Sequence, residues 1–191
     1  MRKSKSKLLV CLGLVMALVL TTVAPATSME VQAAKKATTN YNYRKAPAVK
    51  TGTTTITARP FKASNSKKKN LAIVGFVKFT APKTATYQFT VSKVAIKGKP
   101  GTYANGCVTF YTGMGSSSSR YPKSYLKVKT QGGKTDTLYV CSSSEYKPAK
   151  ITANTFITSR TATVKLKKGQ VVYLDFNNGK TNTYSLTIKK K

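Results

Sequence analysis

The stretch "FVKFTAPKTATYQFTVS", from Phe76 to Ser92, decides the fold. In its second half, "TYQFTVS", every second side chain is apolar, so one face of an extended chain is apolar and the other polar. The intervening "APKT" contains residues that favour turns. The stretch therefore predicts two β-strands around a turn in the manner of a hairpin, with Lys78 on the solvent side.

The same two-residue period recurs along the chain, in "TATVKLK" (161–167), "QVVYLDF" (170–176) and "TYSLTIK" (183–189). Turn signals such as "TQGGKT", "KKGQ" and "NNGKTN" separate these runs. No apolar period of 3.6 residues is long enough for a substantial helix. About eight strands are expected, an all-β pattern typical of an antiparallel β-sandwich or jelly roll. Their ranges are 54–58, 71–80, 86–94, 108–112, 125–130, 135–141, 161–167 with 171–176 behind it, and 183–189.

The first residues have the organisation of a secretory signal peptide. Basic residues precede an apolar run from Leu8 to Leu20, which is short for a membrane-spanning helix. Cleavage is expected after Ala33, with the site after Ser28 as the second choice. We therefore expect a signal peptide (1–33), a flexible basic leader (34–52) and a single β-sandwich domain (53–191). With neither a wall-sorting motif nor an apolar tail, the protein is expected to be secreted and held at the cell surface, if at all, without a covalent bond.

The chemistry of the side chains argues against an enzyme. The chain has no histidine, which excludes Ser–His–Asp and Cys–His catalysis and histidine-containing zinc sites. The acids beyond the leader are Asp136, Glu145 and Asp175, which lie far apart and are expected to be isolated surface charges beside lysines. We predict no catalytic residue, no metal site and no cofactor.

The charge indicates a polyanionic partner. The chain has 34 Lys+Arg against four acids, a net charge of +30, which is more than solubility requires. Lysines far outnumber arginines, which favours diffuse, salt-sensitive attraction over sequence-specific recognition of nucleic acid. The residues expected to bind are Lys67, Lys68, Lys69, Lys127, Lys129, Lys165, Lys167, Lys168, Lys189, Lys190 and Lys191.

Three functions are compatible with this charge. The first is a module held electrostatically on anionic cell-envelope polymers, with exposed tyrosines available for glycan contact. The second is a released protein that binds nucleic acid or glycosaminoglycans. The third is a cationic membrane-active toxin, although no amphipathic basic helix is present to act on a bilayer. We rank them in this order.

The cysteines beyond the leader are Cys107 and Cys141. Export to an oxidising compartment favours a disulfide between them, and each lies on the less apolar side of its predicted strand. Two separate thiols are the alternative.

Two segments resemble bacterial pre-peptidase C-terminal-type domains. "FVKFTAPKTATYQF" is similar to their "F-x-F-x-A-P-x-x-G-x-Y-x-F" opening, and "LKKGQVVYLDFNNGKTNTYSLTI" to their closing segment. The resemblance covers the chain from about Val74 to the end and implies a jelly-roll-like accessory domain of a secreted protein. Ala85 stands where the family usually has a turn glycine. The calcium site of some members does not transfer, because it requires clustered acids that this chain lacks.

Overall fold

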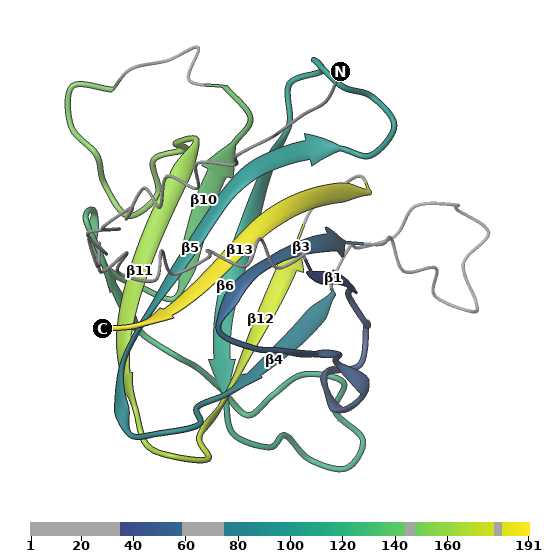
Figure 1. The fold of residues 1–191 in the computed structure, drawn as a ribbon, viewed down its shortest axis with the longest axis vertical. Helices are drawn as coiled ribbons and strands as arrows, with labels where there is room; N and C mark the ends of the chain where they lie inside the picture. The colour runs from purple at the N-terminus through teal and green to yellow at the C-terminus, as the bar shows by residue number, and fades with distance from the viewer. Residues whose placement is uncertain (1–34, 59–74, 144–147, 178–180) are drawn as a thin grey trace, which may run out of the picture. The chain divides into compact units, whose positions relative to one another are not determined.

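The computed structural model describes residues 35–58, 75–143, 148–177 and 181–191, in which two β-sheets pack face to face (Figure 1). The larger sheet has seven strands, in the order β1 (Lys35–Thr38), β3 (Gly52–Ala58), β13 (Asn182–Lys190), β5 (Ala85–Ile96), β11 (Ser159–Leu166), β8 (Val128–Thr130) and β9 (Gly133–Thr135). The smaller sheet has six: β10 (Thr137–Cys141), β6 (Asn105–Thr112), β12 (Val171–Asn177), β4 (Phe76–Thr80) and β2 (Ala48–Val49), with β7 (Ser124–Tyr125) paired to β6. Pairing is antiparallel except for β1–β3 and β2–β4. The predicted all-β sandwich is confirmed.

The two strands of the opening stretch do not form a hairpin. β4 pairs with β12 in the smaller sheet, whereas β5 pairs with β11 and β13 in the larger one. The turn between them therefore carries the chain across the core, and Phe79 of β4 packs edge-on against Tyr87 and Phe89 of β5, with ring centroids 5.1 and 5.6 Å apart. Alternation of apolar residues predicts which side chains face inward, but it is the same for two paired strands and for two strands in facing sheets.

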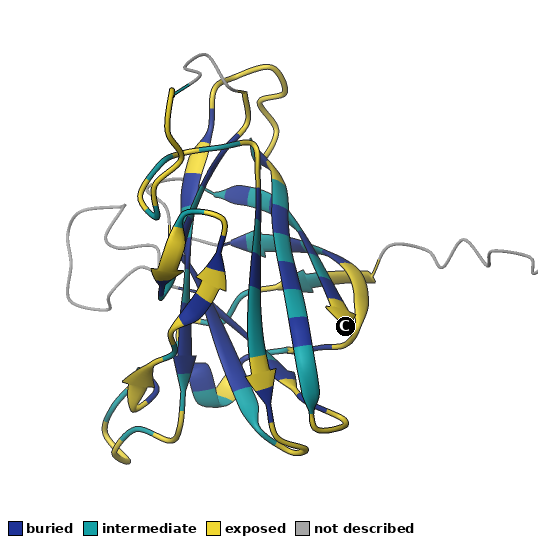
Figure 2. Cartoon of the chain, turned by 90° about the vertical axis from the view of Figure 1, so that its left-hand side faces the viewer, coloured by how far each residue is buried: buried dark blue, intermediate teal, exposed yellow. Residues whose placement is uncertain are grey.

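The main core lies between the sheets and consists of the inward residues of both. Figure 2 shows buried residues alternating with less buried ones along several of the strands. Aromatic rings cross it in edge-to-face contacts, such as Phe89 with Phe110 at 5.4 Å and Phe176 with Tyr184 at 5.0 Å. Burying side chains of this size stabilises the fold by about 1.5–3 kcal/mol each.

A second apolar cluster covers the outer face of the smaller sheet. It consists of Tyr43, Ala46, Phe76, Tyr111 and Tyr173, and Tyr43 is fully buried in it. Tyr43 comes from η1 (Tyr43–Lys45), a 3-10 helix between β1 and β2.

The expectation of a flexible, unpatterned leader over 34–52 is corrected for the described part, 35–52. β1 is the edge strand of the larger sheet and β2 that of the smaller sheet, and Tyr43, from the segment that joins them, is buried on the outer face of the smaller sheet. This structure depends on contacts with distant strands, which a polar local sequence does not reveal.

The predicted strand 125–130 is divided between the two sheets. Tyr125 pairs with Tyr111 in the smaller sheet, whereas Lys129 pairs with Thr163 in the larger one. Tyr125 and Lys129 therefore lie in different sheets. The predicted strand 135–141 is likewise divided, at Asp136, into β9 and β10.

Cys107 and Cys141 are free thiols, so the predicted disulfide is not formed. They lie on the paired strands β6 and β10, but Cys107 is opposite Tyr139, and Cys141 is opposite Asn105. Such diagonal neighbours have Cα atoms roughly 7–8 Å apart, beyond the usual reach of a disulfide. Burial raises the pKa of both thiols, and a hydrogen bond with Tyr103 offsets part of the effect at Cys141.

Candidate polyanion-binding face

The outer face of the larger sheet is polar, and its lysines gather toward one end. One row across the strands reads Lys189, Gln88, Thr163, Lys129 and Lys134, each opposite the next in register. At about 4.8 Å between strands, the backbone positions of Lys189 and Lys129 lie roughly 14 Å apart.

Lys165 adds a further positive charge next to this row. It is opposite Thr86 on β5, two residues beyond the Gln88–Thr163 pair in the direction in which β11 ends, and therefore on the same face of the sheet. We define the lysine face as the exposed side chains Lys129, Lys134, Lys165 and Lys189.

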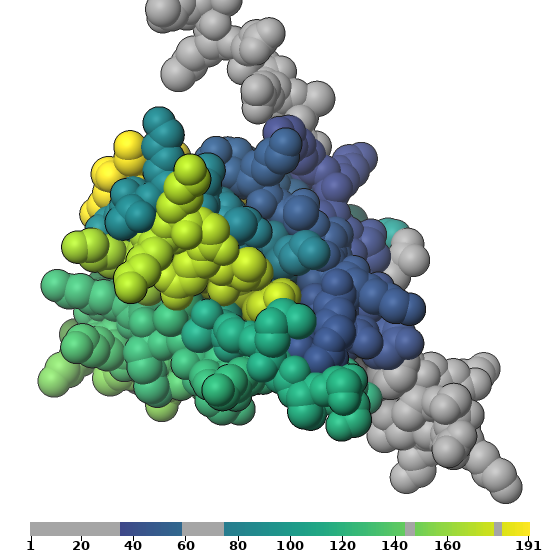
Figure 3. Space-filling view, turned by 90° about the horizontal axis from the view of Figure 1, so that it is seen from below, coloured from purple at the N-terminus to yellow at the C-terminus, as the bar shows by residue number. Residues whose placement is uncertain are grey.

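The remaining predicted lysines of this region lie at the end of the same sheet. Lys167 and Lys168 form the turn after β11, and the backbone N–H of Lys168 donates to the Thr84 hydroxyl. The backbone N–H of Lys191 donates to the carbonyl oxygen of Thr86, which places the C-terminus beside β5. The view from below has both the lime turn after β11 and the yellow C-terminal residues on one side of the molecule (Figure 3).

Most of the rest of the outer face carries neutral side chains, apart from the exposed Lys36 of β1, which is opposite Thr55. Threonine hydroxyls bond to each other across neighbouring strands, Thr53 with Thr187 at 2.9 Å and Thr90 with Thr161 at 3.0 Å. Both pairs belong to one row, which reads Thr53, Thr187, Thr90 and Thr161 and lies next to the lysine row. The lysine face thus gathers four lysines at one end of a surface on which charges are sparse elsewhere.

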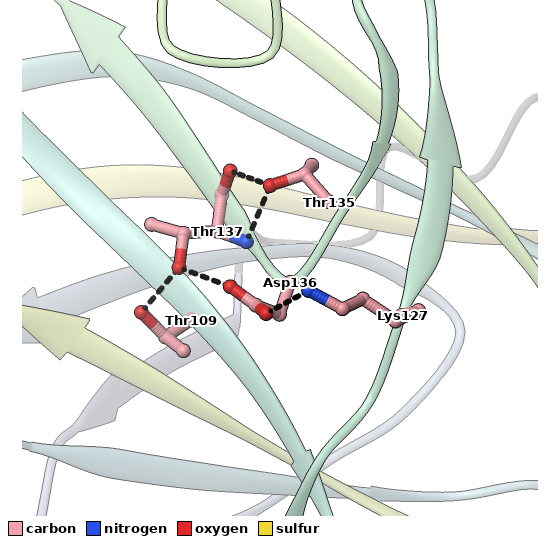
Figure 4. A network of polar contacts seen from close by, with 5 residues as sticks. All are labelled: Thr109, Lys127, Thr135, Asp136 and Thr137. Atoms are coloured by element: carbon pink, nitrogen blue, oxygen red, sulfur yellow. Dashed lines mark hydrogen bonds and ion pairs between the residues drawn. The ribbon is translucent and has the colours of Figure 1, made fainter.

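Lys127 does not belong to the lysine face. Its Nζ lies 2.5 Å from Asp136 Oδ2, and Thr137 donates a hydrogen bond of 3.0 Å to the other carboxylate oxygen (Figure 4). Burial alone would raise the pKa of Asp136, but the hydrogen bonds from Lys127 and Thr137 and the charge of Lys127 outweigh it, and the pKa is lowered. The expectation of an acid that neutralises a lysine is met at this pair.

Asp175 is not the surface acid that the sequence suggested. It lies on the outer face of the smaller sheet and is 3% exposed. Among the described residues, none of the four lysines of the lysine face forms an ion pair with an acid. Their charge is therefore available to a ligand.

Two arginines form hydrogen bonds to backbone carbonyl oxygens and so stabilise loops of the fold. The guanidinium of Arg44 donates to the carbonyl oxygens of Ser119, at 2.5 Å, and Gly115, at 2.9 Å. Arg160 is fully buried and donates to the carbonyl oxygens of Thr152 and Thr155. Burial lowers its pKa. The exposed positive charge is thus carried mainly by lysine, whose hydrated ammonium suits non-specific attraction.

The predicted binding residues divide into three groups. Lys129, Lys165, Lys167, Lys168, Lys189, Lys190 and Lys191 lie on the lysine face or at the end of its sheet, Lys127 is paired with Asp136, and Lys67, Lys68 and Lys69 lie outside the described residues. Sequence reasoning missed Lys134, because "TQGGKT" was interpreted only as a turn. The turn joins β8 to β9, and that pairing places Lys134 opposite Lys129.

The described part of the chain contains neither a metal cluster nor a membrane-spanning helix. Residues 35–58, 75–143, 148–177 and 181–191 bring no group of three or more Cys, Asp or Glu side chains together. In the same ranges no helix has the length and apolar character needed to cross a bilayer.

Comparisons with known proteins do not assign a family. No protein-family model matches the chain, and no curated protein matches it. Among solved structures, one similar chain is CorA of Methylomicrobium album BG8, a surface-associated copper-binding protein, with a TM-score of 0.38 and 6% identity over 81% of this chain and 100% of that chain. A likeness at this level supports no inference about function.

Proposed function

We propose that the protein is a secreted, non-catalytic binding module that is held on anionic cell-envelope polymers by its lysine face. The observation that carries the proposal is the row of Lys189, Lys129 and Lys134, with Lys165 beside it and no acid paired to any of them among the described residues. Lys129 and Lys134 are directly opposite each other, and like charges placed in this way repel one another and cost stability unless counter-charges neutralise them. A phosphate-bearing polymer laid along this end of the sheet would supply that neutralisation.

The type of residue supports a polymer over a small anion. The lysines lie on an open sheet surface, and the hydroxyls and amide between them are those of Thr163 and Gln88. On such a surface the positive charges are separated by one or more strand spacings, and no walls surround them to enclose a small anion. A chain with repeated negative charges satisfies several lysines at once, and the release of its counterions makes binding weaken with salt.

The test is co-sedimentation of the signal-free protein with bacterial cell walls, either intact or stripped of their anionic polymers, across a salt series. We expect binding to intact walls that declines steeply with salt and is lost on stripped walls. The triple variant Lys129→Gln/Lys165→Gln/Lys189→Gln should bind roughly 100-fold more weakly, at about 1 kcal/mol per lysine near an anionic surface.

A matched variant separates the lysine face from net charge. Lys50→Gln/Lys97→Gln/Lys99→Gln removes the same charge from exposed positions outside the face and should keep most of the affinity. Equal losses in both variants would overturn the assignment of the face. Binding to free nucleic acid or heparin but not to walls would instead favour the released polyanion-binding protein. Leakage of anionic vesicles would favour the membrane-active toxin.

A further inference from the structure

A pocket opens on the outer face of the smaller sheet, the face opposite to the lysines. Its volume is about 410 Å³, and its lining residues are Tyr111, Tyr121, Pro122, Lys123, Ser124, Tyr125, Asp175 and Asn177. β6 and β12 form its floor, and the segment 121–125 forms its wall. We call it the tyrosine pocket. Nothing in the polyanion proposal uses it.

The floor of the pocket carries a buried carboxylate. Asp175 is 3% exposed, and its Oδ1 accepts a hydrogen bond of 3.0 Å from the backbone N–H of Gly75. The described residues make no other hydrogen bond to this carboxylate. Asp175 lines the pocket, and a carboxylate can accept several hydrogen bonds, so it has acceptor capacity left for a ligand.

The electrostatic state of Asp175 agrees with this geometry. Burial raises its pKa to about 7, and the hydrogen bond from Gly75 offsets part of that effect. A ligand that donates hydroxyl hydrogens to the carboxylate would stabilise its ionised form.

The side of the pocket is aromatic. The rings of Tyr111 and Tyr125 lie 4.7 Å apart at 31°, and the ring of Tyr121 lies 6.5 Å from that of Tyr111. Tyr111 is nearly buried, whereas Tyr125 is 62% exposed, an unusual position for so large a ring. Burial and a hydrogen bond with Tyr125 raise the pKa of Tyr111, so its hydroxyl stays neutral at ordinary pH.

The wall is held in place from outside. The Tyr43 hydroxyl accepts a 2.9 Å hydrogen bond from the backbone N–H of Gly115, and Arg44 binds the carbonyl oxygens of Gly115, Ser116 and Ser119. In the view from below, the purple and blue N-terminal strands lie against the green loop region (Figure 3). The loop that leads to Tyr121 is therefore fixed before a ligand arrives, which lowers the entropy cost of binding.

The lining distinguishes between ligand classes. An anionic ligand would be repelled by the Asp175 carboxylate. An ammonium ligand would be repelled by Lys123 and by the positive net charge of the protein. A neutral sugar is repelled by neither group. Its apolar C–H face fits the electron-rich face of an exposed ring, and its hydroxyls can donate to Asp175 and bond to the amide of Asn177.

We propose that the tyrosine pocket binds a neutral saccharide, with Tyr125 stacking on a pyranose ring and the Asp175 carboxylate accepting hydrogen bonds from its hydroxyl groups. The protein would then hold two envelope components on opposite faces, a polyanion on the larger sheet and a glycan on the smaller. The pocket's assignment does not depend on that of the lysine face.

The test is titration of the signal-free protein with four trisaccharides, built from glucose, N-acetylglucosamine, mannose or galactose, each at millimolar concentration. The chain has no tryptophan to mask its tyrosine fluorescence, which reports binding, but only three of its 11 tyrosines line the pocket, so amide NMR shifts are used to locate the ligand. We expect at least one trisaccharide to bind and to shift the amides of residues 121–125 and 175–177.

The variants make the assignment specific. Tyr125→Ala should weaken binding roughly tenfold through lost stacking, and it leaves the fold intact because the ring is largely exposed. Asp175→Asn should weaken binding roughly tenfold, because hydrogen bonds to a charged acceptor are the stronger ones. Tyr41→Ala removes another exposed tyrosine, outside the pocket, and should bind as the parent does.

The lysine-face triple variant should also retain saccharide binding, which keeps failure of the two proposals distinguishable. Binding of none of the four trisaccharides, or binding that survives both Tyr125→Ala and Asp175→Asn, would overturn the inference. So would preferential binding of tetramethylammonium chloride, which would identify the pocket as a cation site.

Discussion

The hydroxyl of Tyr43 accepts a hydrogen bond of 2.9 Å from the backbone N–H of Gly115, across 72 positions of sequence. This bond joins the N-terminal strands to the loop that leads to the tyrosine pocket. Next to it, the Arg44 guanidinium lies 4.7 Å from the centre of the Tyr43 ring and donates to the carbonyls of the same loop. Tyr43 and Arg44, which belong to the predicted polar leader, thus hold the loop beside the tyrosine pocket in place. We call these contacts the brace.

Replacing Arg44 tests the brace. Arg44→Ala removes hydrogen bonds from a charged donor to loop carbonyls and should lower the free energy of unfolding by about 1–3 kcal/mol. It should also speed amide hydrogen exchange in residues 113–121, as measured by mass spectrometry. Arg44→Lys should not restore protection, because an ammonium cannot span several carbonyls as the planar guanidinium does.

The neighbouring Lys45→Ala serves as the control, because this side chain is exposed and makes no such bonds among the described residues. An Arg44→Ala protein whose loop exchanges at the parent rate would show that the loop is fixed by other contacts.

Asp175 should make the protein less stable as the pH rises. Its pKa is about 7 in the folded protein against an ordinary 3.8, so between these values the folded state binds the proton that the unfolded chain has lost. The free energy of unfolding should therefore fall as the pH rises through this window, by at most about 4 kcal/mol, and level off above it. Urea denaturation at a series of pH values measures the slope.

Asp175→Asn should remove most of that slope. The amide oxygen can still accept the hydrogen bond from Gly75, and no charge has to be buried, so the variant should be more stable than the parent above pH 7 by about 1–3 kcal/mol. A variant less stable than the parent at this pH would mean that the carboxylate is stabilised by contacts other than the one with Gly75.

The ion pair of Lys127 with Asp136 should contribute little, and with the opposite pH dependence. The pKa of Asp136 is lowered in the folded protein, so its contribution is present above 3.8 and lost as the pH falls through the folded value. The side chains are 68% and 25% exposed, so the pair is screened by solvent and should be worth about 0.2–1 kcal/mol.

A double-mutant cycle with Lys127→Gln and Asp136→Asn measures this coupling in low and high salt. We expect the coupling energy to shrink in high salt. A coupling that is unchanged by salt would indicate that the hydrogen bonds, including the one from Thr137, outweigh the charge.

The sequence predicted the strands well where the two-residue period is strong, as in β5, β11 and β13. It predicted their inward residues for the same reason, since Tyr87, Phe89 and Leu186 are all buried. What alternation cannot encode is the partner of each strand. β4 and β5 therefore looked like a hairpin although they face each other across the core.

The burial of side chains on the outer face of the smaller sheet was not predicted from the sequence. In "VVYLDF", Tyr173 and Asp175 alternate with core residues, which normally predicts exposure, yet both are buried. Tyr43 packs on Tyr173, and Tyr121 packs on Phe76 of the same face, and both come from segments that are distant in sequence and carry no local apolar pattern. The lysine face was easier to foresee, because exposed strand positions and excess charge are both visible locally.

Gly106 provides a test of the core geometry at β6. A Cβ atom built on it would lie 2.0 Å from the Tyr184 hydroxyl oxygen and 2.8 Å from the ring carbon that carries it. Gly106→Ala should therefore force the Tyr184 ring to move and cost about 1–3 kcal/mol of unfolding free energy, the usual cost of overpacking. Thermal or urea denaturation measures the loss.

The double variant Gly106→Ala/Tyr184→Phe separates steric crowding from loss of backbone freedom. Removing the hydroxyl oxygen eliminates the shortest contact, so the alanine should cost less in the Tyr184→Phe background than in the parent. An equal cost in both backgrounds would contradict the contact, because alanine restricts the unfolded backbone to the same extent whichever ring faces it.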